Sequence, residues 1–532
     1  MQTTYPGVYI QEVPSGVYTI TGVSTSMTAF VGRAKKGDVN KPIVIHSFSD
    51  FNRIFGGLWE KSTMSFAVQQ YFLNGGTEAI IVRVVHIDPE TSASTAKTAE
   101  IRLDPLQTSG STDQLTLEAA SPGSWGKNLR VSVNYDTSEG DIDNSDRKLF
   151  NLIVRDPAPG DIDDKKVDLK GTGTGDIEIL RNLSLDKNSP SFITRVLEQQ
   201  SKYLRVKNLP EGMPIPNEVD YKAAEDNSGN DGDDITDSDI WVEGDKKGVR
   251  ALEDADIFNL LCLPPLTFET DLDPITYANA AIYCGNRRAM LLVDLPSGST
   301  TPALALNDAK GFSALPGENA AIFFPRIKMA NQLKNNLLYT FTPSGAIAGV
   351  FARTDSQRGV WKAPAGIDAK LFGVSELSYT MTDGENGELN PLGINCLRTF
   401  PTIGTIVWGS RTMKGADALA SEWKYIPVRR TALYIEESLF RGTKWVVFEP
   451  NDEPLWAQIR LNVGAFMHNL FRQGAFQGKT PKEAYLVKCD KETTTQDDIN
   501  RGIVNILVGF APLKPAEFVI IKIQQLAGEI QT

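Results

Sequence analysis

The segment from Gly474 to Thr480, which reads GAFQGKT, comes closest to a motif that could do chemistry. A phosphate-binding loop needs four residues between its two glycines, so that successive backbone amides curl around the phosphates, and it follows a strand. Here only three residues separate Gly474 from Gly478, and the segment follows a predicted helix. The spacing therefore argues against nucleotide binding.

A second candidate is the acidic stretch between Asp220 and Asp256, which holds thirteen Asp or Glu residues and four Lys or Arg residues. A calcium-binding EF-hand loop needs oxygen ligands at positions 1, 3 and 5, glycine at position 6 and an acidic residue at position 12. A loop starting at Asp226 misses the glycine by one residue, and one starting at Asn227 places Ser238 at position 12. The stretch is interpreted as a solvated acidic face. An irregular calcium site is the alternative that the ligand rules leave open.

Histidines and cysteines form no catalytic or metal-binding pattern. The histidines, His46, His86 and His468, have no cysteine or carboxylate at metal-ligand spacing, and no Gly-x-Ser-x-Gly sequence supplies an activated serine. The four cysteines are scattered and are expected to be buried as small hydrophobic residues. We therefore expect no enzyme activity, no cofactor and no metal.

Basic side chains form the remaining set with a chemical role. Arginine and lysine bind carboxylates through charge-assisted hydrogen bonds, and such pairs orient partners across an interface. The candidates for contacts with a partner or a neighbouring copy are Arg353, Arg358, Lys362, Arg429, Arg430, Arg460 and Arg472.

The predicted secondary structure follows two different patterns along the chain. After residue 256, apolar strands alternate with amphipathic helices, which indicates a mostly parallel sheet covered on both sides. From about residue 95 to 250, short alternating segments lie between Gly, Asp, Ser and Pro clusters, which indicates an inserted β-rich domain. Residues 444–449 are predicted to form a strand, and Asn451 or Asp452 is predicted to cap the next helix. The predicted fold class is a mixed α/β, multidomain protein.

A chain of 532 residues exceeds a single hydrophobic core, so several domains are expected. The predicted segments are an N-terminal arm (1–27), the N-terminal part of the core (28–94), the β-rich insertion (95–250), an α/β domain (251–390), a C-terminal core domain (391–510) and a C-terminal arm (511–532).

Both ends of the chain carry a short apolar strand bounded by prolines. A projecting apolar strand pairs readily with another chain, so we expect both strands to be lent to neighbouring copies. The alternative is that both strands close the chain's own sheet. The predicted strands comprise Val8, Tyr9, Ile10, Gln11, Glu12 and Val13 at the N-terminus, and Glu517, Phe518, Val519, Ile520, Ile521, Lys522 and Ile523 at the C-terminus.

The hinges and the acceptor sheet follow from the same interpretation. Proline and glycine next to each strand predict hinges at Pro14, Gly16, Pro512 and Pro515. The expected acceptor is a small sheet built from residues 28–34 and 79–86. Its acceptor residues are Ala29, Phe30, Val31, Ile80, Ile81 and Val82.

Several separated blocks of the chain resemble the contractile tail sheath family, found in phages with contractile tails and in bacterial injection machines derived from them. The C-terminal blocks are residues 473–481, 487–490 and 511–521, the N-terminal blocks are residues 5–13, 28–32, 48–57 and 75–76, and the central block is residues 349–366. The resemblance covers roughly residues 1–88 and 251–532, and it does not extend to residues 95–250.

The resemblance implies a structural subunit that polymerises around an inner tube. Copies would stack as rings, of six by resemblance, in a helical homo-oligomer that is tethered to a baseplate and closed by a terminator or cap protein. The sheath would shorten and drive the tube through a target envelope without nucleotide hydrolysis. The C-terminal domain would lie nearest the tube, where part of the basic set would contact it, and the acidic insertion would face outward. The alternatives are a soluble α/β enzyme with a β-rich accessory domain, and a non-contractile tube or shell protein.

Composition sets the remaining expectations. The net charge of −12 argues against direct nucleic-acid binding, because a phosphate backbone calls for a basic face. No stretch approaches the roughly 20 apolar residues that span a bilayer, and the first 25 residues lack a secretory signal pattern. We therefore expect assembly in the bacterial cytoplasm as part of a phage tail or a phage-tail-like particle, without membrane insertion.

Overall fold

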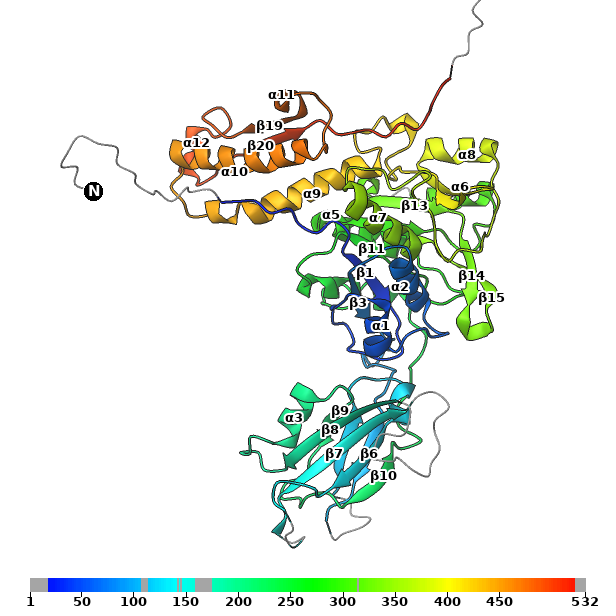
Figure 1. Ribbon diagram of the computed structural model, residues 1–532, viewed down its shortest axis with the longest axis vertical. Coiled ribbons are helices and arrows are strands. Elements are labelled where there is room, and N and C mark those ends of the chain that lie inside the picture. The colour runs from blue at the N-terminus through cyan, green and yellow to red at the C-terminus, as the bar shows by residue number, and fades with distance from the viewer. Residues whose placement is uncertain are drawn as a thin grey trace, which may run out of the picture.

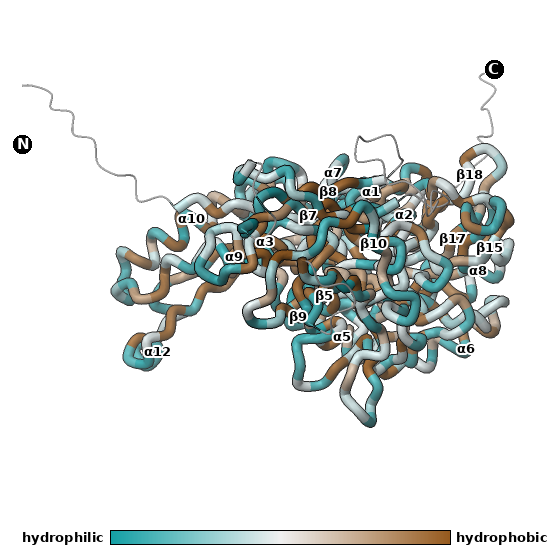
Figure 2. The backbone as a smooth tube through the Cα atoms, turned by 90° about the horizontal axis from the view of Figure 1, so that it is seen from below, coloured by the Kyte–Doolittle hydropathy of each residue, from teal (hydrophilic) through white to brown (hydrophobic). Residues whose placement is uncertain are grey.

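The computed structural model describes residues 18–106, 113–140, 143, 146–157, 175–312 and 315–521. The molecule is elongated, with a β-rich insertion at one end, an α/β body in the middle and a C-terminal helical unit at the other end (Figure 1). Hydrophobic stretches of backbone lie mainly in the interior of these parts, and hydrophilic stretches lie on loops at the margin (Figure 2).

An eight-stranded sheet forms the body, in the order β18-β17-β13-β12-β11-β1-β3-β2. The strands from β17 to β3 are parallel, and β18 and β2 pair antiparallel at the two edges. The inner strands β1, β3, β11, β12 and β13 are buried along their whole length, which is why they read as continuous apolar runs. The predicted α/β architecture is confirmed. The strands are β1 (Thr28–Gly32), β2 (Ile43–Ile45), β3 (Ala79–Arg83), β11 (Leu260–Cys262), β12 (Met290–Asp294), β13 (Ala320–Phe324), β17 (Ile394–Phe400) and β18 (Gly404–Val407).

Helices cover both faces of this sheet. One core cluster contains side chains of α1 (Phe48–Phe55), α2 (Thr63–Leu73) and α7 (Ser344–Arg358). A second cluster, which draws on the opposite sides of the strands, contains side chains of α5 (Pro274–Asn286), α6 (Pro302–Gly311) and α8 (Asp383–Leu389).

A small antiparallel sheet flanks the body, in the order β15-β14-β16. Its strands are β14 (Ile327–Asn331), β15 (Leu337–Phe341) and β16 (Glu376–Leu377). The hairpin of β14 and β15 projects from the side of the body in Figure 1.

The insertion consists of two antiparallel sheets with a hydrophobic core of their own, which includes Trp125, Phe150 and Leu204. The first sheet pairs β4 (Glu100–Leu103), β5 (Leu115–Ala119) and β9 (Leu204–Asn208). The second sheet pairs β10 (Val219–Ala223), β6 (Arg130–Asn134), β7 (Leu149–Pro157) and β8 (Gly175–Ser184), and the helix α3 (Ile193–Gln200) accompanies them.

The boundary expected at residue 250 is too late. Ile235, Ile240 and Val249 are buried in the core of the body, together with the short helices α4 (Asp237–Ile240) and η3 (Val249–Asp254). Within the described residues, two adjacent connecting segments join the insertion to the body. Lys97 on one segment and Asn230 on the other face each other in an antiparallel bridge.

The C-terminal unit packs two antiparallel-running helices, α9 (Ile426–Gly442) and α10 (Glu453–Arg472), with a two-stranded sheet of β19 (Tyr485–Lys488) and β20 (Leu507–Phe510). Short helices α11 (Pro481–Ala484) and α12 (Gln496–Asn500) complete it. Its core includes Trp456, Ile459 and Phe466. The domain expected from residue 391 therefore begins later, because β17 and β18 belong to the central sheet.

The connection between α9 and α10 differs from the sequence prediction. Residues 444–446 form a short 3-10 helix, and Phe448 has a left-handed φ of 73°, so the predicted strand at 444–449 is wrong. The side chain of Asp452 accepts from the backbone N–H of Leu455, which confirms the predicted cap at the start of α10.

Candidate functional site

The glycine-rich segment at 474–480 is a structural turn that holds the end of the C-terminal sheet. Phe476 is buried and forms a bridge with Pro512, and the backbone N–H of Gln477 donates to the carbonyl of Ala511 at 2.9 Å. Gly478 has a φ of 120°, and a Cβ there would lie 3.0 Å from that of Glu483. The glycines thus serve a tight connection between α10 and α11.

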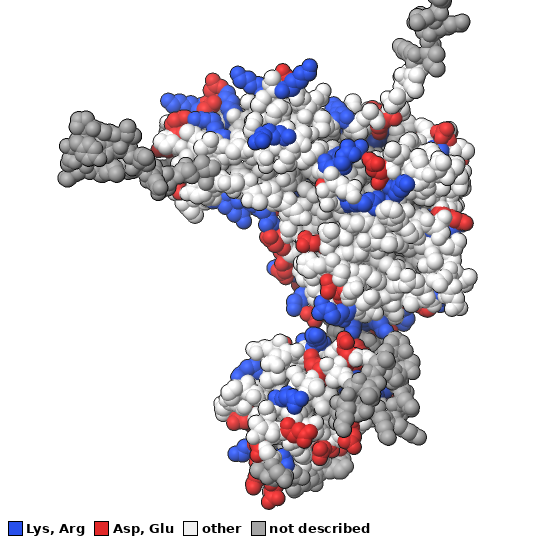
Figure 3. Space-filling model, in the orientation of Figure 1, with Lys and Arg blue, Asp and Glu red and all other residues white. Residues whose placement is uncertain are grey.

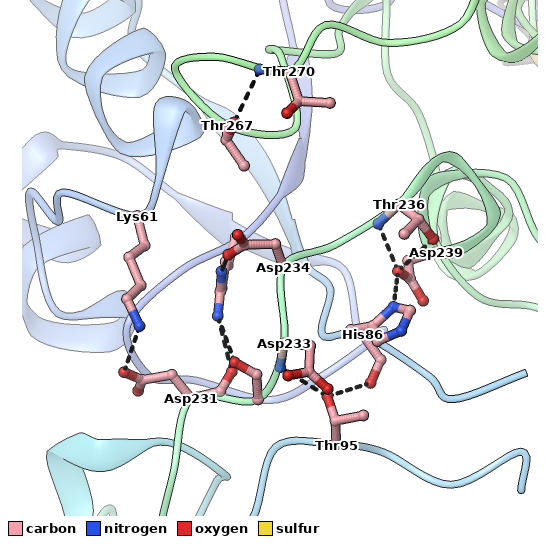
Figure 4. Close-up of polar contacts among 12 residues, drawn as sticks. Lys61, His86, Thr95, Asp231, Asp233, Asp234, Thr236, Asp239, Thr267 and Thr270 are labelled. Atoms are coloured by element: carbon pink, nitrogen blue, oxygen red, sulfur yellow. Dashed lines mark hydrogen bonds and ion pairs between the residues drawn. The ribbon is translucent and has the colours of Figure 1, made fainter.

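The acidic stretch of the insertion joint is engaged with donors from this chain (Figure 4). Asp231 accepts from the backbone and hydroxyl of Ser124, both at 2.8 Å. Asp234 pairs with Arg33. Among the residues that the structure describes, no group of three or more His, Cys, Asp or Glu side chains could hold a metal ion.

Asp239 ties the same joint to the body. It is 4% exposed, and its carboxylate accepts from the backbone of Ile87 at 2.9 Å and lies 2.8 Å from Nδ1 of His86. The prediction of a solvated acidic face therefore holds only in part, because hydrogen-bond donors compensate the burial of this carboxylate.

Charged side chains of both signs gather where the insertion meets the body, whereas the visible face of the body is mostly uncharged (Figure 3). Lys36 is an example of these charges at the joint. It pairs with Asp156 at 3.2 Å and lies over the rings of Trp125 and Tyr203. The charges seen at the joint thus connect two parts of one chain.

The carboxyl end of β12, a position where an α/β enzyme binds its ligand, is filled by a side chain of this chain. Asp294 ends β12 and accepts from the hydroxyl of Ser344 at 2.6 Å, at the start of α7. Burial raises the pKa of Asp294 to about 6. A cavity lined by Phe268, Arg326 and other side chains has a volume of about 20 Å³, which is room for a water molecule but not for a substrate.

The expected acceptor strands have no free edge. β1 lies between β3 and β11, so Ala29, Phe30 and Val31 belong to a strand that is paired on both sides. β3 lies between β1 and β2, and Ile80 and Ile81 pair with strands on both sides, whereas Val82 pairs, among the described strands, with β1 alone. The acceptor prediction is therefore wrong for the residues that are paired on both sides, because a donated strand needs unpaired backbone N–H and C=O groups.

Among the described residues, strands with an unpaired edge lie at the margins of the other sheets, such as β2, and both strands of the sheet in the C-terminal unit have one. β19 and β20 pair with each other along Tyr485–Lys488 and Leu507–Phe510, and in the described part of the chain neither has a second strand as partner. Leu486 and Leu507 are each 52% exposed. We call this pair of strands the open ladder.

The N-terminal segment (residues 18–27) lies along α9 of its own chain. Tyr18 stacks on Trp445, with ring centroids 4.4 Å apart, and Ile20 is buried against Gly442. At the other end of the segment, the carbonyl of Thr25 accepts from Arg430 at 2.9 Å. Any lent N-terminal arm therefore ends before residue 18. The predicted strand at Val8, Tyr9, Ile10, Gln11, Glu12 and Val13, and the hinges at Pro14 and Gly16, lie outside the described residues.

The C-terminal segment (residues 511–521) leaves β20 and crosses from the C-terminal unit to the body (Figure 1). Glu517, which was predicted to belong to the lent strand, is bound by Arg411 of its own chain. The next four residues, Phe518 to Ile521, are 72% to 82% exposed and pair with no strand of the described chain. The alternative that this strand closes its own sheet does not hold for these four residues. Lys522 and Ile523 lie outside the described residues.

Four of the seven basic candidates are committed to their own chain. Arg430 forms a buried ion pair with Asp355 at 2.6 Å. Arg353 donates to the carbonyls of Asn74 and Lys370. Arg429 donates to the side chains of Asn319 and Glu436. Arg460 donates to the carboxylate of Glu453 and to the carbonyl of Cys489.

The other three basic candidates remain at the surface. Arg358 is exposed and lies 3.6 Å from Asp368, Lys362 is half-buried, and Arg472 is exposed at the end of α10. Only these three keep the predicted role of contacting a partner.

The described part of the molecule thus has unpaired strand edges and four consecutive exposed apolar residues, Phe518 to Ile521. Such features suit a structural subunit that assembles with other chains. Two family descriptions match the sequence, "Phage tail sheath protein central domain" over residues 233–413 and "Phage tail sheath C-terminal domain" over residues 420–525. The chain belongs to the phage tail sheath family, whose members are structural proteins and not enzymes.

Relatives of known identity agree with this assignment. The chain is 26% identical over 177 residues to the tail sheath protein of Vibrio phage KVP40, a match that covers 33% of this chain and 25% of the relative. It is 24% identical over 232 residues to a putative prophage major tail sheath protein of Pseudomonas aeruginosa, which covers 43% of this chain and 56% of the relative. The match therefore spans a quarter of the length of the Vibrio phage protein and about half of the length of the Pseudomonas aeruginosa protein.

Solved structures share the fold along nearly the whole chain. The sheath complex of an extracellular contractile injection system in its contracted state matches with a TM-score of 0.57 and 21% identity, over 99% of this chain and 98% of that chain. The contracted helical sheath of the anti-feeding prophage matches with a TM-score of 0.56 and 22% identity, over 98% of this chain and 99% of that chain. No helix in the described part of the chain is long and apolar enough to cross a membrane.

Proposed function

We propose that this protein is the sheath subunit of a contractile phage tail or phage-tail-like injection particle. Copies polymerise helically around an inner tube, and the assembled sheath contracts to drive the tube through a target envelope. The observation that carries the proposal is the C-terminal segment, which leads from the open ladder to four consecutive exposed apolar residues, Phe518 to Ile521. A run of this kind is unfavourable in water and suits a strand that another chain covers.

The N-terminal and C-terminal segments leave the body at positions far apart, which favours contact with two different neighbouring copies. The N-terminal segment leaves at the end of α9, beside Gly442, and the C-terminal segment passes Arg411, which pairs with Tyr425 at the start of α9. A helix of 17 residues is about 25 Å long. Two strands that leave so far apart reach two different copies, which makes an open, heterologous lattice of the kind that builds tubes.

The open ladder is the acceptor that we assign to the lent strands. Each of its two strands offers one unpaired edge, so one strand from each of two neighbours extends it to four strands. Main-chain hydrogen bonds then hold the lattice together, and the domain bodies can rotate while these ladders stay intact.

The assembly has further partners in this proposal. Rings of six copies stack around the inner tube, a baseplate binds one end of the sheath, and a terminator or cap protein binds the other. Arg358, Lys362 and Arg472 are the basic side chains available for contacts with the tube or a neighbouring copy. The insertion faces outward, and assembly takes place in the bacterial cytoplasm.

Deletion of residues 518–532 tests the proposal. The shortened chain should fold, since the segment buries no core residue in the described chain, and it should fail to polymerise. Electron microscopy of the full chain should show striated rods of two widths. The matched controls are Ile520→Pro, which removes a ladder donor and should also block assembly, and Ile520→Val, which should not.

The same experiment decides between the proposal and its alternatives. Uniform tubes of one width from the full chain would indicate a non-contractile tube or shell protein, and discrete globular particles would indicate an enzyme. Polymerisation of the truncated chain at the level of the full chain would show that the C-terminal strand is not lent.

A further inference from the structure

A buried arginine sits where the C-terminal segment reaches the body. The side chain of Arg411 is 0% exposed, and it follows β18 in the chain. Its backbone N–H donates to Oδ1 of Asn395 at 2.6 Å. Nδ2 of Asn395 in turn donates to the carbonyls of Ile322 at 3.0 Å and of Arg411 at 2.7 Å. The backbone of Arg411 is thereby fixed to β13 and β17 in the central sheet, so its position does not depend on the C-terminal segment.

The guanidinium of Arg411 has two kinds of partner. Its own loop supplies the carbonyl of Gly415 at 3.2 Å and the carboxylate of Asp417 at 3.0 Å. Glu517 binds it with both oxygens, at 2.8 Å to Nε and 2.6 Å to Nη2, and the hydroxyl of Tyr425 lies 3.4 Å from the same carboxylate. A bidentate contact between a carboxylate and a buried guanidinium is strong and geometrically specific. We call this site the Arg411 socket.

The loop of the socket is shaped around the arginine. A Cβ at Gly415 would lie 2.7 Å from the Cβ of Arg411 and 2.6 Å from the carbonyl of Thr412, so only glycine fits. Glu517 is 14% exposed at its side chain although it is four residues from the end of the described chain. The carboxylate of Glu517 is therefore mostly buried, whereas Phe518 to Ile521, which follow it, are exposed to solvent.

The C-terminal segment is fixed at two points. At its start, Ala511 donates to the carbonyl of Ala484 at 2.8 Å and accepts from Gln477 at 2.9 Å. At its far end, Glu517 occupies the socket. Between these points, the segment borders a cavity of about 950 Å³ whose other lining residues include Trp361 and Trp408. Pro512 and Pro515, which were predicted as hinges, lie inside this doubly fixed span.

We propose that Arg411 is a positioning residue for the lent C-terminal strand, because its buried guanidinium captures Glu517 and sets the point from which the strand leaves the body. The inference rests on the proposed sheath function. Residues 511–516 act as a strap between the C-terminal unit and the body, and the first free joint of the strand lies after Glu517, not at the prolines. Loss of Glu517 would leave the buried cation with one carboxylate and free the strand to leave in many directions, which weakens pairing with a neighbour.

The direct test measures where the C-terminal segment lies in the unassembled full-length chain. Spin labels at Ala516→Cys and Glu388→Cys report the distance between the segment and α8, and the four native cysteines are buried. The distance distribution should be narrow with Glu517 present and broad in Glu517→Gln. Lys514→Gln is the matched control, since Lys514 is an exposed charge of the same segment, and it should leave the distribution narrow. Substitutions are placed at Glu517 because Arg411 is buried, and its replacement would endanger the fold.

The second measurement is assembly of the same variants without labels. Loss of a charge-assisted bidentate contact should lower the amount of polymer by about tenfold at limiting protein concentration in Glu517→Gln, with no change in Lys514→Gln. A narrow distribution in Glu517→Gln would overturn the socket. A broad distribution with wild-type assembly would overturn its role in positioning the strand.

Failure of the socket is distinguishable from failure of the proposed function. If deletion of 518–532 abolishes polymerisation while Glu517→Gln assembles normally, the strand is lent and the socket is not needed. If the deletion variant assembles normally, the C-terminal strand is not lent and the proposed lattice fails, whatever Glu517→Gln does.

Discussion

At the scale of single residues, buried charges hold separate parts of the chain together. The ion pair of Arg430 and Asp355 connects α9 with α7, and Arg430 also binds the carbonyl of Thr25 in the N-terminal segment. Breaking such a pair from one side leaves an uncompensated buried charge. These side chains therefore serve the fold of the subunit, and they are not free to meet a partner.

The buried side chain of Asp294 should make the free energy of unfolding depend on pH. Burial raises its pKa from 3.8 to about 6, so between these pH values the folded state holds a proton that the unfolded chain has released. Stability contributed by this group is therefore lost as the pH rises through that window, by up to about 3 kcal/mol. From pH 4 to pH 7, Asp294→Asn should gain stability relative to the parent chain, as measured by urea unfolding of unassembled protein.

The matched control for this prediction is Asp368→Asn, at a carboxylate whose side chain is 72% exposed. Its free energy of unfolding should follow that of the parent chain at every pH. Parallel curves for Asp294→Asn and the parent chain would contradict the assignment of the proton to Asp294.

At the scale of elements, α7 and α2 pack closely because glycines line their contact. A Cβ at Gly345 would lie 2.2 Å from the carbonyl of Ala67, and one at Gly349 would lie 2.5 Å from the carbonyl of Tyr71. Two helices whose backbones approach this closely leave no room for a methyl group. The central block that resembles the sheath family, residues 349–366, begins at Gly349 and contains the second half of α7.

Gly349→Ala should destabilise the unassembled subunit by about 1–3 kcal/mol, because overpacking outweighs the helix propensity that alanine adds. Gly464→Ala on α10 is the matched control, since nothing lies within 4 Å of a Cβ there. That control should instead be stabilised by up to about 1 kcal/mol. Urea midpoints of the two variants decide, and a stabilised Gly349→Ala would show that α7 can move away from α2 at little cost.

At the scale of the whole molecule, the insertion is a separate body on a narrow joint. Lys97 and Asn230 exchange backbone hydrogen bonds at 3.1 and 3.2 Å, so the chain enters and leaves the insertion at adjacent points. The insertion keeps its own hydrophobic core. Charged contacts at the joint, such as the pair of Lys36 and Asp156, hold the insertion against the body.

Replacement of residues 98–229 by a two-residue Asn-Gly turn should give a soluble chain that still polymerises, because the bridge between Lys97 and Asn230 becomes a hairpin end. Circular dichroism, size-exclusion chromatography and electron microscopy of the product check this. The excised domain, expressed alone, should also fold. An insoluble body would show that the insertion is required for its stability, and a soluble body without rods would show that the insertion takes part in assembly.

Sequence patterns predicted the elements whose burial is uniform. The apolar runs at 290–294 and 320–324 form strands that are buried along their whole length, and of the two predicted caps, Asn451 and Asp452, it is Asp452 that caps α10. The same reasoning failed at residues 444–449, where an apolar run forms a 3-10 turn at the surface. Alternation alone does not distinguish a strand from a hydrophobic loop that packs against a neighbouring helix.

The sequence by itself determined that the chain is a multidomain α/β protein with a β-rich insertion, and that an apolar run follows Pro512 and Pro515 near its C-terminus. Only the tertiary structure decided which strands have free edges, which arginines are buried, and that Glu517 belongs to an anchor. The physical reason is that apolar periodicity is local and is written in neighbouring residues. Strand order and ion pairing instead join residues more than a hundred positions apart, such as Arg411 and Glu517, and no local pattern records them.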